Sequence, residues 1–308
     1  MNLRISIFAC LILLTTISCQ RNSTESAEGL IKIVATTGMV ADAAQAIGGE
    51  YVVVESLMGP GVDPHLYKAT HGDLKLLRNA DVILYNGLHL EGKMAEVFEK
   101  MAQLPDKVIH PVAEFIPKAA LKVVDPNGPT YDPHIWFDVV LWAAVYKEIG
   151  DLLSHSYPEH ADYFKANVEG KQAELTVLDG WVQQEINSIP EAQRILITAH
   201  DAFEYFGAAY GIQVKGLQGI STLSEAGLRD VKELVDLIVD QQIKAVFVES
   251  SVPVRDINAV VKGCKEKGHE VAIGGTLFSD AMGEAGTEEG TYEGMVKSNV
   301  NTIVNALR

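Results

Sequence analysis

Short apolar runs alternate with helical segments from Leu30 onward, and this alternation limits the possible folds more than any other feature of the chain. In the first part of the chain the runs are Ile31–Ala35, Tyr51–Ser56, Asp81–Tyr85 and Lys107–His110. Strands that alternate with helices predict a parallel sheet covered by helices on both faces. The same pattern returns further on, where we expect strands at Arg194–Thr198, Gln213–Leu217, Ala245–Glu249 and Glu270–Ile273.

The middle of the chain interrupts this alternation. Val139–Ser154 is typical of one helix, and a second helical segment runs from Pro158 to about Asn187 without a strand signal. A helix of this length suits a connection between two lobes better than a helix inside one sheet. We therefore predict an α/β fold with two lobes, 30–157 and 190–308, each holding a mostly parallel sheet flanked by helices. One long α-helix, 158–189, joins them.

Two capping patterns predict where helices begin. Thr70, with Asp73 three residues later, precedes a helix that we expect to run through Leu77. The run Thr222-Leu223-Ser224-Glu225 has the form of a capping box and predicts a helix from there to about Gln242.

The first eighteen residues have the features of an export signal. Arg4 supplies a positive charge, and the apolar run Ile5–Leu14 is too short to span a bilayer as a helix. Small residues then precede Cys19, as in the lipobox of bacterial lipoproteins, which implies that residues 1–18 are removed and that Cys19 carries a lipid. The alternative is an ordinary signal peptide with an incidental cysteine. Residues 19–29 are polar and would serve as a tether.

Charge and cysteine content narrow the class of protein further. The formal net charge is −16, and no dense stripe of basic residues is present, so nucleic acid is not an expected partner. An acidic surface is compatible with a cationic ligand. The chain has three cysteines. With Cys10 in the signal segment and Cys19 lipidated, Cys264 has no partner for a disulfide, and we expect it to be a buried thiol.

Three of the nine histidines stand out by their positions. His65 and His134 each end an Asp-Pro-His tripeptide, and His200 directly follows a predicted strand. Loops at the carboxyl ends of parallel strands line the crevice of open α/β sheets, so these rings can meet between two lobes. Asp280, just past the last predicted strand, is the best carboxylate to complete the set. Imidazole and carboxylate ligands suit zinc and other transition-metal ions.

Six short sequence motifs resemble those of the zinc- and manganese-binding receptors of bacterial metal importers, in particular the TroA-like branch (cluster 9). They follow one another along this chain in the same order as in that family. The resemblance covers about Ile31 to Leu307. The motifs are Asp63-Pro64-His65, Pro133 to Asp138, Thr198 to Phe206, Lys215 to Gly219, Phe247 to Ser251 and Leu277 to Gly283.

This resemblance implies a function and a set of ligands. The protein would be an extracytoplasmic receptor that captures Zn(II) or Mn(II) between its lobes through His65, His134, His200 and Asp280. It would deliver the ion to the permease and ATPase of an ABC importer. We further expect a monomer in the cell envelope, lipid-anchored on the periplasmic or extracellular face of a membrane.

The identity of the metal stays open at this point. The strictly manganese-type branch has a Glu as its third ligand, whereas this chain has His200. Dedicated zinc receptors often carry a His-rich loop before the second His, and residues 118–131 contain no His. Glu249 and Asp138 lie beside ligand motifs, and we expect them to accept hydrogen bonds from the metal-binding rings.

Two other functions are alternatives. A zinc hydrolase would keep one metal position open and place a general base nearby, but no His-Glu-x-x-His helix or Gly-x-Ser-x-Gly turn is present. We therefore do not expect an enzyme. The second alternative is a surface adhesin or interaction lipoprotein, a role that could coexist with metal capture.

Overall fold

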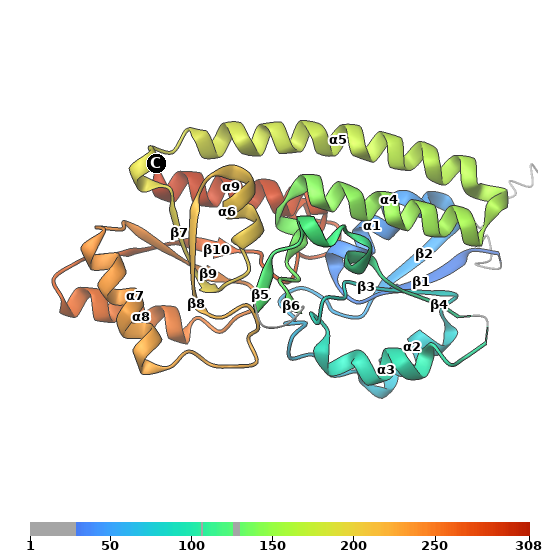
Figure 1. Cartoon of the computed structure of the whole chain (residues 1–308), viewed down its shortest axis with the longest axis horizontal. Helices are drawn as coiled ribbons and strands as arrows, with labels where there is room; N and C mark the ends of the chain where they lie inside the picture. The colour runs from blue at the N-terminus through green and yellow to red at the C-terminus, as the bar shows by residue number, and fades with distance from the viewer. Residues whose placement is uncertain (1–28, 106, 126–129) are drawn as a thin grey trace, which may run out of the picture.

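The computed structural model describes residues 29–105, 107–125 and 130–308 (Figure 1). The predicted signal segment 1–18, Cys19 and most of the tether lie outside these residues. Within the described part of the chain, no helix is long and apolar enough to cross a membrane.

The N-terminal half is built on a four-stranded parallel sheet with the order β2-β1-β3-β4. Side chains of β1 alternate between its two faces: Ile33 and Ala35 pack on the same side as α1, and Val34 packs with Leu77 of α2 and Phe98 of α3. The elements are β1 (Ile31–Ala35), α1 (Gly38–Gly48), β2 (Val52–Ser56), α2 (His71–Asn79), β3 (Val82–Tyr85), α3 (Ala95–Met101) and β4 (Val108–Pro111).

The C-terminal half contains two parallel strand pairs, β7 with β8 and β9 with β10, and β7 lies beside β9. Helices α7 and α8 cover one face of these strands, and α6 and α9 cover the other (Figure 1). The elements are β7 (Ile195–His200), α6 (Glu204–Tyr210), β8 (Gln213–Gln218), α7 (Leu228–Asp240), β9 (Ala245–Glu249), α8 (Arg255–Glu266), β10 (Ala272–Leu277) and α9 (Tyr292–Leu307).

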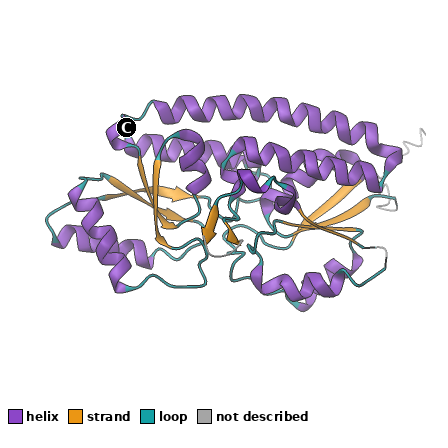
Figure 2. Cartoon of the chain, viewed as in Figure 1, coloured by secondary structure: helices purple, strands orange, loops and turns teal. Residues whose placement is uncertain are grey.

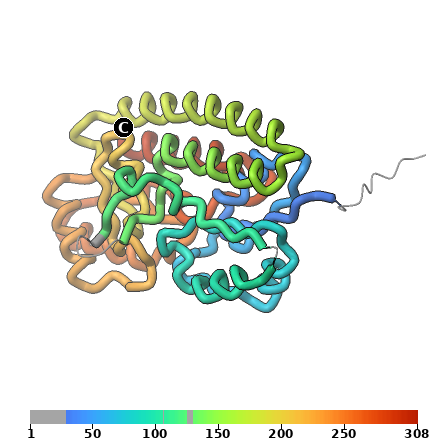
Figure 3. The backbone as a smooth tube through the Cα atoms, turned by 45° about the vertical axis from the view of Figure 1, so that its right-hand side comes forward, coloured from blue at the N-terminus to red at the C-terminus, as the bar shows by residue number. Residues whose placement is uncertain are grey.

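The predicted long helix is present. A 3-10 turn at Pro158–His160 leads into α5 (Ala161–Asn187), which runs along the top of both halves in Figure 1 and along the same edge in Figure 3. Helices α4 (Val139–Ser156) and α9 pack beneath it. One core cluster includes buried side chains of α1, α4, α5, α6 and α9, so the same apolar layer connects the two halves.

The predicted parallel α/β architecture is confirmed, and so is the buried thiol of Cys264. The division at 30–157, 158–189 and 190–308 stays a prediction. A short antiparallel pair, β5 (Val123–Asp125) and β6 (Thr130–Tyr131), was not predicted; Figure 2 shows it between the two halves. Too few residues form these strands to leave a periodic signal in the sequence.

One predicted helix start is wrong. Thr70 caps α2 as expected, with Asp73 completing the capping box. Thr222 caps nothing: α7 begins six residues later, after Gly227, where Asp230 accepts a hydrogen bond from the Gly227 backbone N–H. The hydroxyl of Thr222 instead donates to Asp63 in the N-terminal half. The Thr222 side chain therefore makes a tertiary contact in place of the helix cap that the local sequence pattern predicted.

Candidate metal centre

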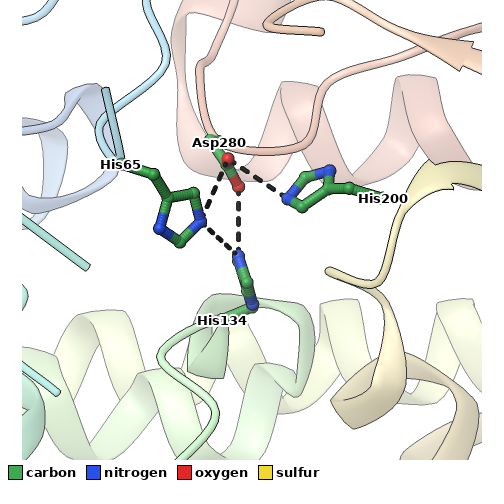
Figure 4. A group of neighbouring side chains, drawn as sticks. All are labelled: His65, His134, His200 and Asp280. Atoms are coloured by element: carbon green, nitrogen blue, oxygen red, sulfur yellow. Dashed lines mark hydrogen bonds and ion pairs between the residues drawn. The ribbon is translucent and has the colours of Figure 1, made fainter. Parts of the chain in front are cut away.

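Four buried side chains from distant parts of the chain meet between the two halves (Figure 4). His65 lies in the loop after β2, His200 is the last residue of β7, and Asp280 follows β10. His134 lies between β6 and the 3-10 turn Ile135–Phe137. Three of the four therefore stand at or beyond the carboxyl ends of parallel strands, as expected for a site in an open α/β fold.

The facing atoms are spaced as ligands of one ion would be. His65 Nε2 lies 3.3 Å from His134 Nε2, and Asp280 carboxylate oxygens lie 3.7, 3.4 and 3.2 Å from the Nε2 atoms of His65, His134 and His200. In a tetrahedral shell with bonds of about 2.0–2.1 Å, neighbouring ligand atoms are about 3.3–3.4 Å apart. One atom from each residue can be chosen so that all four lie within 4.8 Å of one another.

Burial makes this arrangement costly without a cation. His134 and His200 are fully buried, and His65 and Asp280 are each 2% exposed. Within the described residues, Nε2 of His200 and both carboxylate oxygens of Asp280 have no hydrogen-bond partner. Buried polar atoms without partners are rare, because each one loses its hydration. A divalent cation among the four side chains would satisfy all of these atoms.

Two carboxylates fix the rings of His134 and His200 from behind. Asp132 Oδ1 lies 2.7 Å from Nδ1 of His134 and also accepts a hydrogen bond from its backbone N–H. Glu249 Oε2 lies 2.5 Å from Nδ1 of His200, and its other oxygen accepts from the backbone N–H of His200. These contacts place a proton on each Nδ1 and turn each Nε2 toward the centre, where its lone pair can bind an ion when the ring is neutral.

The same carboxylates raise the pKa of both rings. Burial opposes the charge of His134, but Asp132 and Asp280 outweigh it and raise its pKa to about 9. Burial is likewise outweighed at His200, where Glu249 and Asp280 raise the pKa well above its usual value. At His65, which has no such carboxylate behind it in the described residues, burial lowers the pKa to about 4. Burial would raise the pKa of Asp280, yet His200 and His134 hold it well below its usual range.

The two acids expected behind the ligand rings have different positions. Glu249 contacts His200, as described above. Asp138 does not face a ring: its Oδ1 accepts hydrogen bonds from the backbone N–H groups of Val140 and Leu141 and caps α4. Asp132 holds His134 in its place. The signal for Asp132 was the Asp-Pro-His tripeptide itself, in which the Asp two residues before the His accepts a bond from the His backbone.

Comparison with known proteins identifies the family. The family model described as "Zinc-uptake complex component A periplasmic" (ZnuA) matches residues 33–306. The chain belongs to this family. The family consists of substrate-binding components of transporters and not of enzymes, and its members act with ABC importers.

Relatives of this ZnuA-type chain are named for two different metals, manganese and zinc. The manganese-binding lipoprotein MntA of Bacillus subtilis is 55% identical over 284 residues, which cover 92% of each chain. The zinc-binding protein TroA of Treponema pallidum is 45% identical over 282 residues, covering 92% of this chain and 90% of TroA. A solved structure of the Treponema protein superimposes with a TM-score of 0.87 and covers 91% of this chain and 99% of that one.

Proposed function

We propose that this protein is the extracytoplasmic receptor of an ABC importer and that it captures Zn(II) or Mn(II) through His65, His134, His200 and Asp280. The observation that carries the proposal is the convergence of four buried side chains whose ligand atoms lie within 4.8 Å of one another, while Nε2 of His200 and both carboxylate oxygens of Asp280 have no hydrogen-bond partner among the described residues. Relatives that are 55% and 45% identical are named for manganese and for zinc, which supports this pair of ions.

The partners follow from the family. A substrate-binding component delivers its ion to a permease that is coupled to an ATPase. Relatives are named lipoproteins, which supports attachment of this chain to a membrane through a lipid on Cys19. We propose that it acts as a monomer, because one chain supplies all four ligands of the candidate site.

Binding by single-site variants tests the proposal. The purified chain, stripped with chelator, is titrated with zinc and with manganese, and bound metal is measured by elemental mass spectrometry. We expect one ion per chain. His134→Ala and Asp280→Ala should each abolish stoichiometric binding, whereas the exposed His155→Ala should bind like the parent. If the ligand variants keep one tightly bound ion, the assigned site is wrong.

A further inference from the structure

The segment that carries His134 is firmly joined to the C-terminal half. Trp136 Nε1 donates to the Ser279 carbonyl at 3.0 Å, and Tyr292 Oη donates to the Trp136 carbonyl at 2.8 Å. Tyr205 Oη donates to the Asp132 carbonyl at 3.1 Å. These groups are buried, so their hydrogen bonds are expensive to break.

His200 and Asp280 belong to the same framework. His200 lies within β7, and Glu249 at the end of β9 holds both its backbone and its ring. The residues before Asp280 are tied to α9, because Asn299 accepts from the Phe278 backbone N–H and donates to the Phe278 carbonyl. Three of the four candidate ligands therefore sit on one hydrogen-bonded body.

His65 is attached differently. It lies in the loop 57–70 between β2 and α2, whose outer side is exposed at Gly59, Pro60, Gly61 and Leu66. Apart from contacts inside the candidate site, the described residues provide a single hydrogen bond between this loop and residues 190–308. In this bond Thr222 Oγ1 donates to Asp63 Oδ2 at 2.6 Å.

Asp63 divides its two oxygens between two tasks. Its Oδ1 accepts from the backbone N–H groups of His65 and Leu66, at 2.8 and 3.3 Å, and this turn sets the direction of the His65 ring. Its Oδ2 is left for Thr222, a residue only 8% exposed in the irregular segment between β8 and α7. Loss of the Thr222 hydroxyl would therefore leave the His65 turn intact and remove only its link to the C-terminal half.

We propose that Thr222 is a positioning residue that holds the His65 loop closed over the bound ion and thereby sets how long the ion stays. This inference rests on the proposed function. Dissociation of the ion requires one ligand to leave first. His65 is the ligand that can move away from the other three with the fewest broken hydrogen bonds. Differences in affinity between closely related complexes come mainly from the dissociation rate. Removal of this bond should therefore speed release of the ion more than it slows capture.

The dissociation rate of zinc measures this role. Zinc-loaded full chain is mixed with an excess of chelator in a stopped-flow instrument, and release is compared for the parent, Thr222→Val, Thr222→Ser and Thr176→Val. Valine keeps the shape of threonine without the hydroxyl, and serine keeps the hydroxyl. Thr176 is an exposed threonine of α5 whose hydroxyl, among the described residues, donates only to the Gln172 carbonyl, so its variant is a matched control.

We expect Thr222→Val to release zinc about tenfold faster or more, as for the loss of a hydrogen bond to a charged acceptor. Thr222→Ser and Thr176→Val should release it at close to the parent rate. The visible spectrum of bound Co(II), which reports ligand number and geometry, should be the same in all four proteins, because Thr222 acts on the loop and not on the ion.

Each other result overturns the inference. Equal rates for Thr222→Val and the parent would show that the bond does not limit release. A fast Thr222→Ser would show that packing, and not the hydroxyl, is what matters. A changed Co(II) spectrum in Thr222→Val would show that the residue shapes the ligand set. Failure of the parent to bind either zinc or manganese would instead contradict the proposed function.

Discussion

Glu249 holds the ring of His200 from the side opposite Asp280: its Oε2 lies 2.5 Å from Nδ1, and Nε2 of the same ring lies 3.2 Å from the Asp280 carboxylate. Glu249 is also 2% exposed, so its charge acts on the ring with little screening by solvent. A carboxylate behind a ligand ring fixes its tautomer and direction and makes Nε2 a stronger donor to a metal.

We expect Glu249→Ala to weaken zinc affinity about 10- to 100-fold, the usual effect of losing such a partner. Glu249→Gln should have a smaller effect, because its amide oxygen can still accept from Nδ1. Affinities are measured by competition with a chelator of known strength. The exposed Glu159→Ala serves as control and should bind like the parent. An unchanged affinity in Glu249→Ala would show that the framework alone orients the His200 ring.

Substitution of Asp138 should change the stability of the protein, whereas substitution of Asp132 should change its affinity for zinc. Because Asp138 caps α4, Asp138→Ala should lower the free energy of unfolding of the ion-free protein by about 1 kcal/mol and leave zinc affinity unchanged. Asp132→Asn should weaken zinc binding, because the ring of His134 loses its carboxylate. Denaturant unfolding and chelator competition on both variants provide the comparison. A large affinity loss in Asp138→Ala would contradict its role as a cap.

The sequence predicted the parallel sheets because short apolar runs such as β1 alternate with helical segments, and it predicted the connecting helix because α5 is long and contains no strand signal. It also predicted that the four candidate ligands would meet, since most of them follow strand ends. It failed where one side chain has two possible partners. Thr222 was expected to cap a helix and Asp138 to contact a ring, and only the tertiary structure decides that Asp138 caps α4 while Thr222 reaches Asp63.

Replacement of Cys19 tests the membrane anchor, which lies outside the described residues. We expect Cys19→Ala to prevent lipid attachment, so that the protein is released from the membrane or keeps its signal segment. Membrane fractionation and labelling with a radioactive fatty acid measure the two effects, and Cys264→Ala is the matched control because that thiol is buried in α8. Unchanged labelling of Cys19→Ala would show that the lipid is carried elsewhere or is absent.

The ion-free and zinc-loaded proteins should respond differently to pH between about 7 and 8.5. In the ion-free protein the pKa of His134 is raised to about 9, above the value of about 6.5 for an unfolded histidine. Proton binding therefore stabilises the folded state fully below pH 6.5, and this stability is lost as the pH rises toward 9. His200, whose pKa is also raised, acts in the same direction. The melting temperature of the ion-free protein should thus fall across this range.

In the loaded protein the rings must be neutral to bind zinc, and above pH 6.5 the unfolded chain is neutral at these rings as well. The two states then differ little in bound protons, so the melting temperature of the loaded protein should stay nearly constant. The stabilisation by zinc, which is the difference between the two curves, should therefore grow with pH. Affinity should rise about tenfold per pH unit for each proton that zinc displaces.

Variants of His134 and His65 test which ring causes this effect. His134→Gln should reduce the pH dependence of the ion-free protein without abolishing it, because one of the two rings that bind an extra proton is gone and His200 remains. His65→Gln should leave that dependence unchanged, since burial lowers the pKa of His65 to about 4 and its ring is already neutral at pH 7. The melting temperatures of the parent and both variants are compared at pH 7.0 and 8.5, each with chelator and with zinc. If the ion-free parent melts at the same temperature at both pH values, the carboxylates behind the rings do not keep His134 and His200 protonated, and zinc binding at pH 7 displaces no protons from them.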